Sequence, residues 1–222
     1  MNGLRDRMIG FRIARAILKP IFKFWYNPVI IYEGNIPEEN AVVIACNHKH
    51  IMDQCLIISA TKRPINYMAK AEYFKGKFAW FFRMSGCICV NRNGSDEQAK
   101  QEANRVLRRR GAIGIFPEGT RNKTDNLVMD FKYGAASLAC KNSAVIVPVA
   151  VTGEYKFRSK TLVARIGTPF STEGMGVAEA RDKLYNEIVI LIMENLGEGY
   201  GTQQEYEKAR RFNEVSMSTT AV

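Results

Sequence analysis

The spacing of apolar residues changes along the chain and predicts where strands and helices lie. Short apolar runs bounded by Gly, Pro, Asn or charged residues alternate with segments in which apolar residues recur every three to four positions. The first pattern is typical of buried strands and the second of amphipathic helices. The runs predict strands at 29–32, 41–46, 64–69, 87–90, 112–116, 144–151 and 161–166. The longer spacing predicts helices at 52–60, 75–84, 96–110, 130–140 and 177–196.

The alternation of strands and helices predicts an α/β fold, with one domain built on a mostly parallel, mixed sheet flanked by helices. Asn27-Pro28 separates this domain, expected at 28–197, from an N-terminal segment at 1–27. The remaining residues, 198–222, form a polar tail. Within the tail, 205–212 is compatible with a helix, and we expect the last ten residues to be disordered.

The N-terminal segment has the pattern of a basic amphipathic helix. At about 100° per residue, its apolar side chains fall within a half circle and four cations lie beside them. This pattern is typical of a helix that lies in a membrane surface, and also of a helix packed on a protein core. Pro20 predicts a kink or a division into two helices. The apolar residues are Phe11, Ile13, Ala14, Ile17, Leu18, Ile21, Phe22, Phe24 and Trp25, and the cations are Arg12, Arg15, Lys19 and Lys23.

Composition and charge narrow the class of partner. The chain has 222 residues, 46% of them hydrophobic, which is enough for one substantial core. Its formal charge is +10, and residues 1–26 supply half of it, with six cations against one acid. A basic chain favours anionic lipid, acidic carriers or nucleic acid, but no nucleic-acid recognition motif is present. No apolar run approaches the ~18–20 residues that span a bilayer, and no signal peptide is evident. We therefore expect a peripheral or monotopic protein on the cytoplasmic face of a membrane.

The five cysteines do not suggest a metal or disulfide framework. Cys87 and Cys89 are separated by one residue, and no further Cys or His pair completes a zinc site. We interpret the cysteines as small buried apolar residues in a reducing compartment, and we expect no metal site.

Both histidines of the chain and an acid follow the apolar run 41–46. In one continuous helix, His48 and Asp53 would be about 140° apart and could not touch. With His48 in a loop and Asp53 in the first helical turn, the imidazole can return to the carboxylate, which is also favourable at that helix end. A carboxylate that orients an imidazole makes it a general base for an alcohol proton. His50 is interpreted as a loop residue.

A second cluster of polar residues follows other predicted strands. Lys70, Arg92 and Arg121 each come shortly after a strand, and ligands gather at the carboxyl ends of parallel strands. Gly119 lets a ligand approach the backbone, Thr120 offers a hydroxyl, and a guanidinium suits phosphate. Each cation alone is also compatible with ordinary surface charge. Their shared position suggests a phosphate-bearing alcohol placed over His48.

Four blocks between about residues 40 and 170 carry these features in a fixed order. They are Asn47-His48 with Asp53; Gly86 to Val90 with Arg92, preceded by Lys70-Ala71-Glu72-Tyr73-Phe74; Phe116-Pro117-Glu118-Gly119-Thr120-Arg121; and Val145-Ile146-Val147-Pro148-Val149-Ala150. Together they resemble the glycerolipid acyltransferases, in particular the 1-acylglycerol-3-phosphate (lysophosphatidic acid) acyltransferases. The first block matches that family's His-x4-Asp motif, and the resemblance implies the glycerol-3-phosphate acyltransferase-like fold.

The resemblance also implies roles for individual residues. His48 would be the general base and Asp53 its orienting partner. The remaining assignments are phosphate binding for Arg92, Gly119, Thr120 and Arg121 with help from Lys70, loop ordering for Glu118, and the acyl side of the site for Pro148. Asn91 stands where the family often has an acid, and Tyr73 where it commonly has Leu. These departures put the fine acceptor preference in doubt.

The expected reaction is direct acyl transfer to lysophosphatidic acid. His48 would remove the proton of the free sn-2 hydroxyl as it attacks a thioester carbonyl, giving phosphatidic acid, with no metal or cofactor. The thioester would be acyl-CoA or acyl-carrier protein, which the sequence does not distinguish, and neither chain length nor oligomeric state can be read from it. The aromatic segment 73–82 fits an acyl tunnel or core packing.

Three other interpretations stay open at this point. The chain could acylate another acceptor, such as glycerol 3-phosphate or an aminolipid. Cys46, two residues before His48, could be an acylated nucleophile. A non-catalytic peripheral membrane-binding protein would also explain the charge and the amphipathic segment.

Overall fold

One mixed sheet organises the chain. The computed structural model describes residues 2–32, 36–77, 79–91 and 96–220. Seven strands lie in the order β1-β7-β6-β2-β5-β3-β4, and every pairing is parallel except β6 with β7. This confirms the predicted α/β class. The strands are β1 (Val29–Tyr32), β2 (Val42–Cys46), β3 (Ile65–Lys70), β4 (Ile88–Val90), β5 (Ala112–Ile115), β6 (Val145–Thr152) and β7 (Val163–Ile166).

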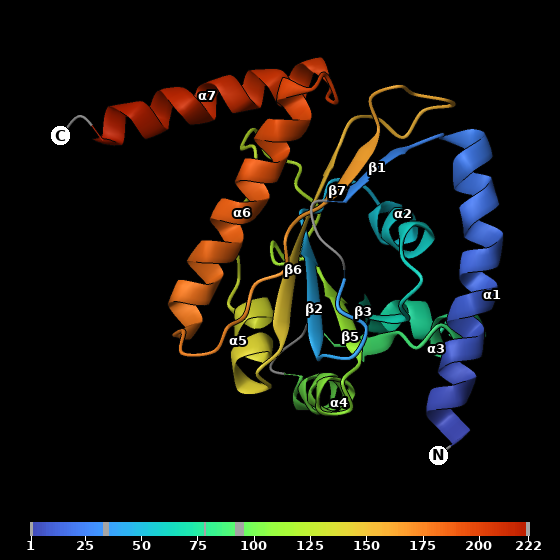
Figure 1. The fold of residues 1–222 in the computed structure, drawn as a ribbon. Coiled ribbons are helices and arrows are strands. Elements are labelled where there is room, and N and C mark those ends of the chain that lie inside the picture. Colours follow the sequence, from blue (N-terminus) through green and yellow to red (C-terminus); the bar gives the residue numbers. More distant parts are fainter. Residues whose placement is uncertain (1, 33–35, 78, 92–95, 221–222) are drawn as a thin grey trace.

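Helices cover both faces of the sheet. In Figure 1, α1 and α2 lie on one side and α5 and α6 on the other, while α7 runs from the end of α6 away from the sheet. Helix α1 also packs on α3. The helices are α1 (Asn2–Trp25), α2 (Asp53–Ala60), the 3-10 turn η1 (Ala71–Phe74), α3 (Ala79–Met84), α4 (Glu97–Arg108), α5 (Gly134–Lys141), α6 (Val177–Gly197) and α7 (Gln203–Thr220).

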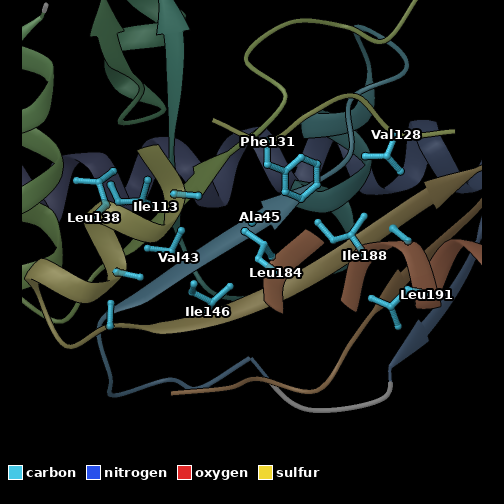
Figure 2. Packing of buried hydrophobic residues seen from close by; sticks show 14 of the residues in the cluster. Val43, Ala45, Ile113, Val128, Phe131, Leu138, Ile146, Leu184, Ile188 and Leu191 are labelled. Atoms are coloured by element: carbon cyan, nitrogen blue, oxygen red, sulfur yellow. The ribbon is translucent and has the colours of Figure 1, made fainter. Parts of the chain in front are cut away.

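Alternation along the central strands divides the core in two. Successive side chains of a strand point to opposite faces, so Val43 and Ala45 of β2 join one hydrophobic cluster and Val42 and Ile44 join the other. Figure 2 shows the first cluster, in which side chains from α5 and α6 pack over the central strands. All five residues of β2 are buried, as expected for a strand covered on both faces.

Helix α1 carries two apolar stripes, one buried and one exposed. Phe11, Ala14 and Phe22 are buried against the sheet side of the fold. A second stripe remains exposed. It consists of Ile9, Ile13, Ile17, Ile21, Phe24 and Trp25.

Pro20 and Gly10 bear on the course of α1 and on how closely it packs against α3. Pro20 lies inside a helix that the structure keeps continuous from 2 to 25, so the expected division into two helices is wrong. At Gly10, an added Cβ would lie 2.0 Å from the carbonyl oxygen of Met84. The helix therefore approaches the end of α3 more closely than any side chain at Gly10 would allow.

Other boundaries differ from the sequence expectations for local reasons. Within the segment expected to be a helix at 75–84, the structure has the shorter helix α3, and the 3-10 turn at 71–74 precedes that segment. The expected disorder of the last ten residues is wrong up to residue 220, because α7 continues to that point. Thr202 and Glu205 begin that helix with reciprocal hydrogen bonds of 2.7 and 3.1 Å, which is a capping box. Phe212 then packs against the core and anchors the second half of the helix.

Adjacent residues of α1 provide a test of the two stripes. Phe22→Ala should lower the free energy of unfolding by about 3–5 kcal/mol, because the ring is 1% exposed and leaves a cavity. Ile21→Ala, at 50% exposure, should change it by less than about 0.5 kcal/mol. Urea denaturation followed by circular dichroism measures both. Equal losses for the two variants would contradict the arrangement of α1.

Candidate active site

The carboxyl ends of three parallel strands meet at one edge of the sheet and carry predicted site residues there. Strand β2 leads into His48, β3 ends at Lys70, and β5 leads into the loop 116–121. A cavity of about 910 Å³ lies over this edge. Its wall includes His48, Lys70, Phe116, Gly119, Thr120 and Arg121, so the structure brings these predicted residues together.

His48 and Asp53 form the contact that the loop-and-helix arrangement predicts. His48 Nδ1 lies 2.9 Å from Asp53 Oδ2, and the carboxylate is completely buried. The backbone N–H groups of Lys49 and His50 donate to the same oxygen at 2.9 and 2.8 Å. A carboxylate oxygen surrounded by donors accepts, so Nδ1 of His48 carries the proton and Nε2 keeps its lone pair. This tautomer is the one that a general base requires.

Aromatic stacking holds the His48 ring against β5. The imidazole stacks on Phe116, with centroids 3.9 Å apart and planes at 15°, and Phe116 in turn stacks on Tyr67 at 5.9 Å. Tyr67 fits closely because its strand partner is Gly114, where an added Cβ would lie 2.4 Å from the tyrosine ring. Gly114 in β5 therefore helps to orient the ring of His48 in the loop after β2.

Glu118 connects the two motif loops through its carboxylate. The backbone N–H of His48 donates to Oε1 at 2.6 Å, and that of Met129 donates to Oε2 at 3.0 Å. Burial raises the pKa of Glu118, although both hydrogen bonds act in the opposite direction. The side chain is 2% exposed and does not line the cavity, so it orders the loops and does not contact a ligand there.

The loop at 119–121 lines the cavity. Gly119 has φ of +74°, a conformation that favours glycine. The Lys132 side chain crosses its free face, where an added Cβ would lie 2.9 Å from Nζ. Lys132 lines the cavity together with Lys70 and Arg121, and Lys100 and Lys141 also line it, so five cations among the described residues lie around one space. Sequence reasoning missed Lys132, because no strand or glycine precedes it directly.

Pro148 and Cys46 are not among the described residues that line this cavity. Arg92 lies outside the described residues. Pro148 lies within β6, opposite Ala45 of β2, and is not among the described cavity-lining residues, which does not support its predicted place on the acyl side. Cys46 is buried, and burial together with the charges of Asp53 and Glu118 raises its thiol pKa well above the ordinary value. A thiolate at Cys46 is therefore disfavoured, which weakens the acyl-cysteine alternative.

Residues distant in sequence support the His48 loop. Asn47 exchanges two hydrogen bonds of 2.8 and 2.9 Å with the backbone of Val151 in β6. Lys49 Nζ donates to the Gly153 carbonyl at 2.5 Å and forms an ion pair with Glu205 of α7. Only the polar character of Asn47 at a strand end was visible in the sequence. The partners of Lys49 gave no local signal, because they lie more than 100 residues away.

Tyr155 and His50 complete the surroundings of Asp53. The Tyr155 hydroxyl donates to Asp53 Oδ1 at 2.8 Å, and its ring stacks on His50 at 4.4 Å. The Nδ1 of His50 accepts from the Met52 N–H at 3.2 Å. Burial lowers the pKa of His50, and nearby cations add to this effect against the opposing charge of Asp53. His50 is thus a loop residue, as expected, with a packing role against Tyr155.

The cysteines do not gather at the cavity. All five are free thiols, and the expectation that they are all buried holds fully only for Cys46, because Cys55, Cys87 and Cys140 are partly buried and Cys89 is exposed. Within the described part of the chain, no group of three or more His, Cys, Asp or Glu residues could hold a metal ion.

Comparison with known proteins places the motifs in one family. The acyltransferase family model matches residues 29–152, which include the His48 loop, the 116–121 loop and β6. A 1-acyl-sn-glycerol-3-phosphate acyltransferase of Borreliella burgdorferi is 32% identical over 165 residues, and one of Bacillus subtilis is 25% identical over 180 residues. The alignments cover 72% and 78% of this chain, and 65% and 89% of those relatives.

A solved structure shares the fold. The crystal structure of the 1-acyl-sn-glycerophosphate (LPA) acyltransferase PlsC from Thermotoga maritima superimposes with a TM-score of 0.67 at 24% sequence identity. The match covers 80% of this chain and 76% of that one. This similarity supports the architecture described above.

The buried carboxylate of Glu118 leads to a stability prediction. Glu118→Gln replaces one acceptor oxygen with an NH₂ group that faces a backbone N–H, so the free energy of unfolding should fall by about 1–3 kcal/mol. Glu173→Gln, which changes an exposed carboxylate, should alter it by less than about 0.5 kcal/mol. Chemical denaturation measures both, and an unchanged Glu118→Gln variant would contradict the structural role of this residue.

Proposed function

The chain belongs to the acyltransferase family, and on that premise we propose that it transfers a fatty acyl group from an acyl thioester to the free sn-2 hydroxyl of lysophosphatidic acid, giving phosphatidic acid. The names of the relatives in Borreliella and Bacillus support this acceptor. The observation that carries the proposal is the 2.9 Å contact between His48 and Asp53 at the wall of a cavity that is also lined by Lys70, Arg121 and Lys132.

The proposed reaction uses His48 as the general base. Nε2 takes the proton of the acceptor hydroxyl while the hydroxyl oxygen forms a bond to the thioester carbonyl carbon. The tetrahedral adduct then collapses, its C–S bond breaks, and the thiolate receives the proton from His48. Asp53 stabilises the imidazolium that exists between these two transfers, because its Oδ2 faces the Nδ1 proton. The base is thereby regenerated in each turnover.

The cations explain why the acceptor would carry a phosphate. Lys70, Arg121 and Lys132 line the cavity that contains His48, and Gly119 lines it beside them. A bound phosphate would hold the rest of a short glycerol backbone near the base, and this positioning can contribute several kcal/mol to catalysis, roughly 7–11 at best. Thr120, which also lines the cavity, is suited to donate a hydroxyl hydrogen bond to the same group.

Another part of the cavity wall is suited to an acyl chain. It includes Ile51, Tyr67, Tyr73 and Phe82, and the Tyr73 and Phe82 rings stack with centroids 5.1 Å apart. No residue of η1 or α3 is buried, so core packing does not account for the aromatic character of this segment. We assign the apolar wall to the acyl chain, delivered by acyl-CoA or acyl-carrier protein.

Helix α1 supplies the proposed contact with an anionic membrane surface. Its exposed stripe continues into Phe157, whose ring contacts Trp25 at 5.2 Å and Phe24 at 6.5 Å. The cations Arg12, Lys19 and Lys23 are exposed on the same helix. Apolar residues with flanking cations are the pattern of an interfacial helix. None of the described helices combines the length and apolar character needed to cross a bilayer.

Removing the proposed base should abolish turnover without loosening the fold. His48→Ala should lower kcat by about 10²–10⁴-fold, because the imidazole supplies general-base catalysis. Mass spectrometry of products from purified protein, mixed acyl donors and a panel of acceptors measures this effect. The panel contains lysophosphatidic acid, glycerol 3-phosphate and an amino-headgroup lysolipid.

The panel also tests the choice of acceptor separately from the class of reaction. Lysophosphatidic acid should be the preferred acceptor of the wild-type protein, and binding to anionic vesicles should survive in His48→Ala. Preference for another acceptor would overturn the substrate assignment and leave the reaction class in place. Normal acylation by His48→Ala would overturn the assignment of the base, and an inactive wild-type protein that still binds vesicles would favour the non-catalytic alternative.

The exposed stripe of α1 yields a membrane-binding prediction. The double variant Ile17→Ser with Ile21→Ser should bind anionic vesicles at least about tenfold more weakly, because each isoleucine would lose its burial in lipid. Ile190→Ser in α6, where the side chain is 51% exposed, is the matched control and should bind normally. Vesicle co-sedimentation measures all three proteins. Equal binding by the double variant and the wild type would contradict a role of this stripe at the membrane.

A further inference from the structure

Asp53 is held by donors from two distant parts of the chain. Oδ2 accepts from His48 Nδ1 and from the N–H groups of Lys49 and His50, all within its own loop. Oδ1 accepts from the hydroxyl of Tyr155, which lies 102 positions away. The terminal torsion of an aspartate is broad and roughly two-fold, so donors on both oxygens define the plane of the carboxylate better than donors on one.

The topology explains why Tyr155 reaches this position. Strands β2 and β6 are parallel neighbours, so the segments that follow them leave the same edge of the sheet side by side. Asn47 fixes the two exits by its hydrogen bonds to Val151. Gly153 then turns with φ of +84°, where an added Cβ would lie 1.9 Å from the Thr161 carbonyl oxygen. The turn directs Tyr155 toward the start of α2.

The Tyr155 ring is fixed independently of its hydroxyl. It stacks on His50 at 4.4 Å and packs edge-on against Tyr26 at 5.6 Å. Burial, the charge of Asp53 and the hydrogen bond to it raise the pKa of Tyr155 well above its ordinary value. The hydroxyl therefore remains protonated at every pH at which the protein would work and stays a donor to the carboxylate.

We infer that Tyr155 is a positioning residue for the acyl-transfer reaction, orienting Asp53 so that its Oδ2 faces the Nδ1 proton of His48. The residue lies outside the matched family region 29–152 and does not line the cavity, so it acts through Asp53 and not on a substrate. This role rests on the proposed function. A merely structural tyrosine would serve through its ring, whereas a positioning residue needs its hydroxyl.

The first test separates the hydroxyl from the ring. Tyr155→Phe keeps both ring contacts and removes only the donor, and it should lower kcat about tenfold while KM stays within about twofold. Tyr26→Phe removes a hydroxyl from the same aromatic group and should leave both parameters unchanged. An unchanged kcat in Tyr155→Phe, or equal losses in the two variants, would overturn the proposal.

The second test examines the His48–Asp53 contact by NMR and does not depend on catalytic turnover. The chain has only two histidines, so ¹⁵N-histidine labelling gives two ring systems to follow by NMR. The Nδ1 proton signal of His48 should shift and broaden in Tyr155→Phe and stay in place in Tyr26→Phe. An unperturbed His48 signal in Tyr155→Phe would overturn the positioning role even if kcat fell.

A double-mutant cycle distinguishes action through Asp53 from a general weakening of the site. In an Asp53→Ala background, adding Tyr155→Phe should lower kcat by less than about twofold, because the carboxylate that it orients is gone. A further tenfold loss in that background would overturn the proposal. If the wild-type protein acylates no acceptor of the panel, the proposed function fails, and the NMR comparison still decides whether the Tyr155 hydroxyl orders the two side chains.

Discussion

A buried carboxylate is stable in a protein only if its hydrogen-bonding capacity is used, and Asp53 illustrates how that constraint shapes a site. Four donors surround it, three from the loop 48–50 and one from Tyr155. Satisfying this group requires the loop after β2 to curl around the start of α2 and requires the segment after β6 to lie beside it. The same geometry directs Nδ1 of His48 to Asp53, so the contacts that stabilise the buried acid also orient the proposed base.

Several other parts of the fold support the loop around Asp53. Glu118 fixes the backbone of His48 to the 116–121 loop, and Phe116 fixes the ring. Lys49 and Gly153 are joined to Glu205, so the first turn of the C-terminal helix also contributes. The cations that would hold a phosphate lie at the open side of this assembly and are exposed or partly exposed. The loop that carries the proposed base His48 is thus held by several contacts, and the charged groups beside it remain accessible to a ligand.

Helix α1 links the proposed membrane contact to the same region. One of its stripes packs into the core through Phe11 and Phe22, and the other is open to the surroundings. The end of α1 and the residue after it touch the segment after β6, through Phe24 and Trp25 with Phe157 and through Tyr26 with Tyr155. The segment after β6 therefore connects α1, the helix proposed to contact the membrane, with the surroundings of Asp53.

Local patterns were sufficient to determine the α/β class, most element positions, the pairing of His48 with Asp53 and the grouping of Lys70, Gly119 and Arg121. Each of these depends on residues close together in sequence or on the rule that parallel strands end at one edge. Only the tertiary structure decided which stripe of α1 is buried, that Pro148 lies away from the cavity, and that Lys132, Glu205 and Tyr155 support the site. Those contacts join residues far apart in the chain, and they follow from the strand order, which the period of hydrophobic residues does not encode.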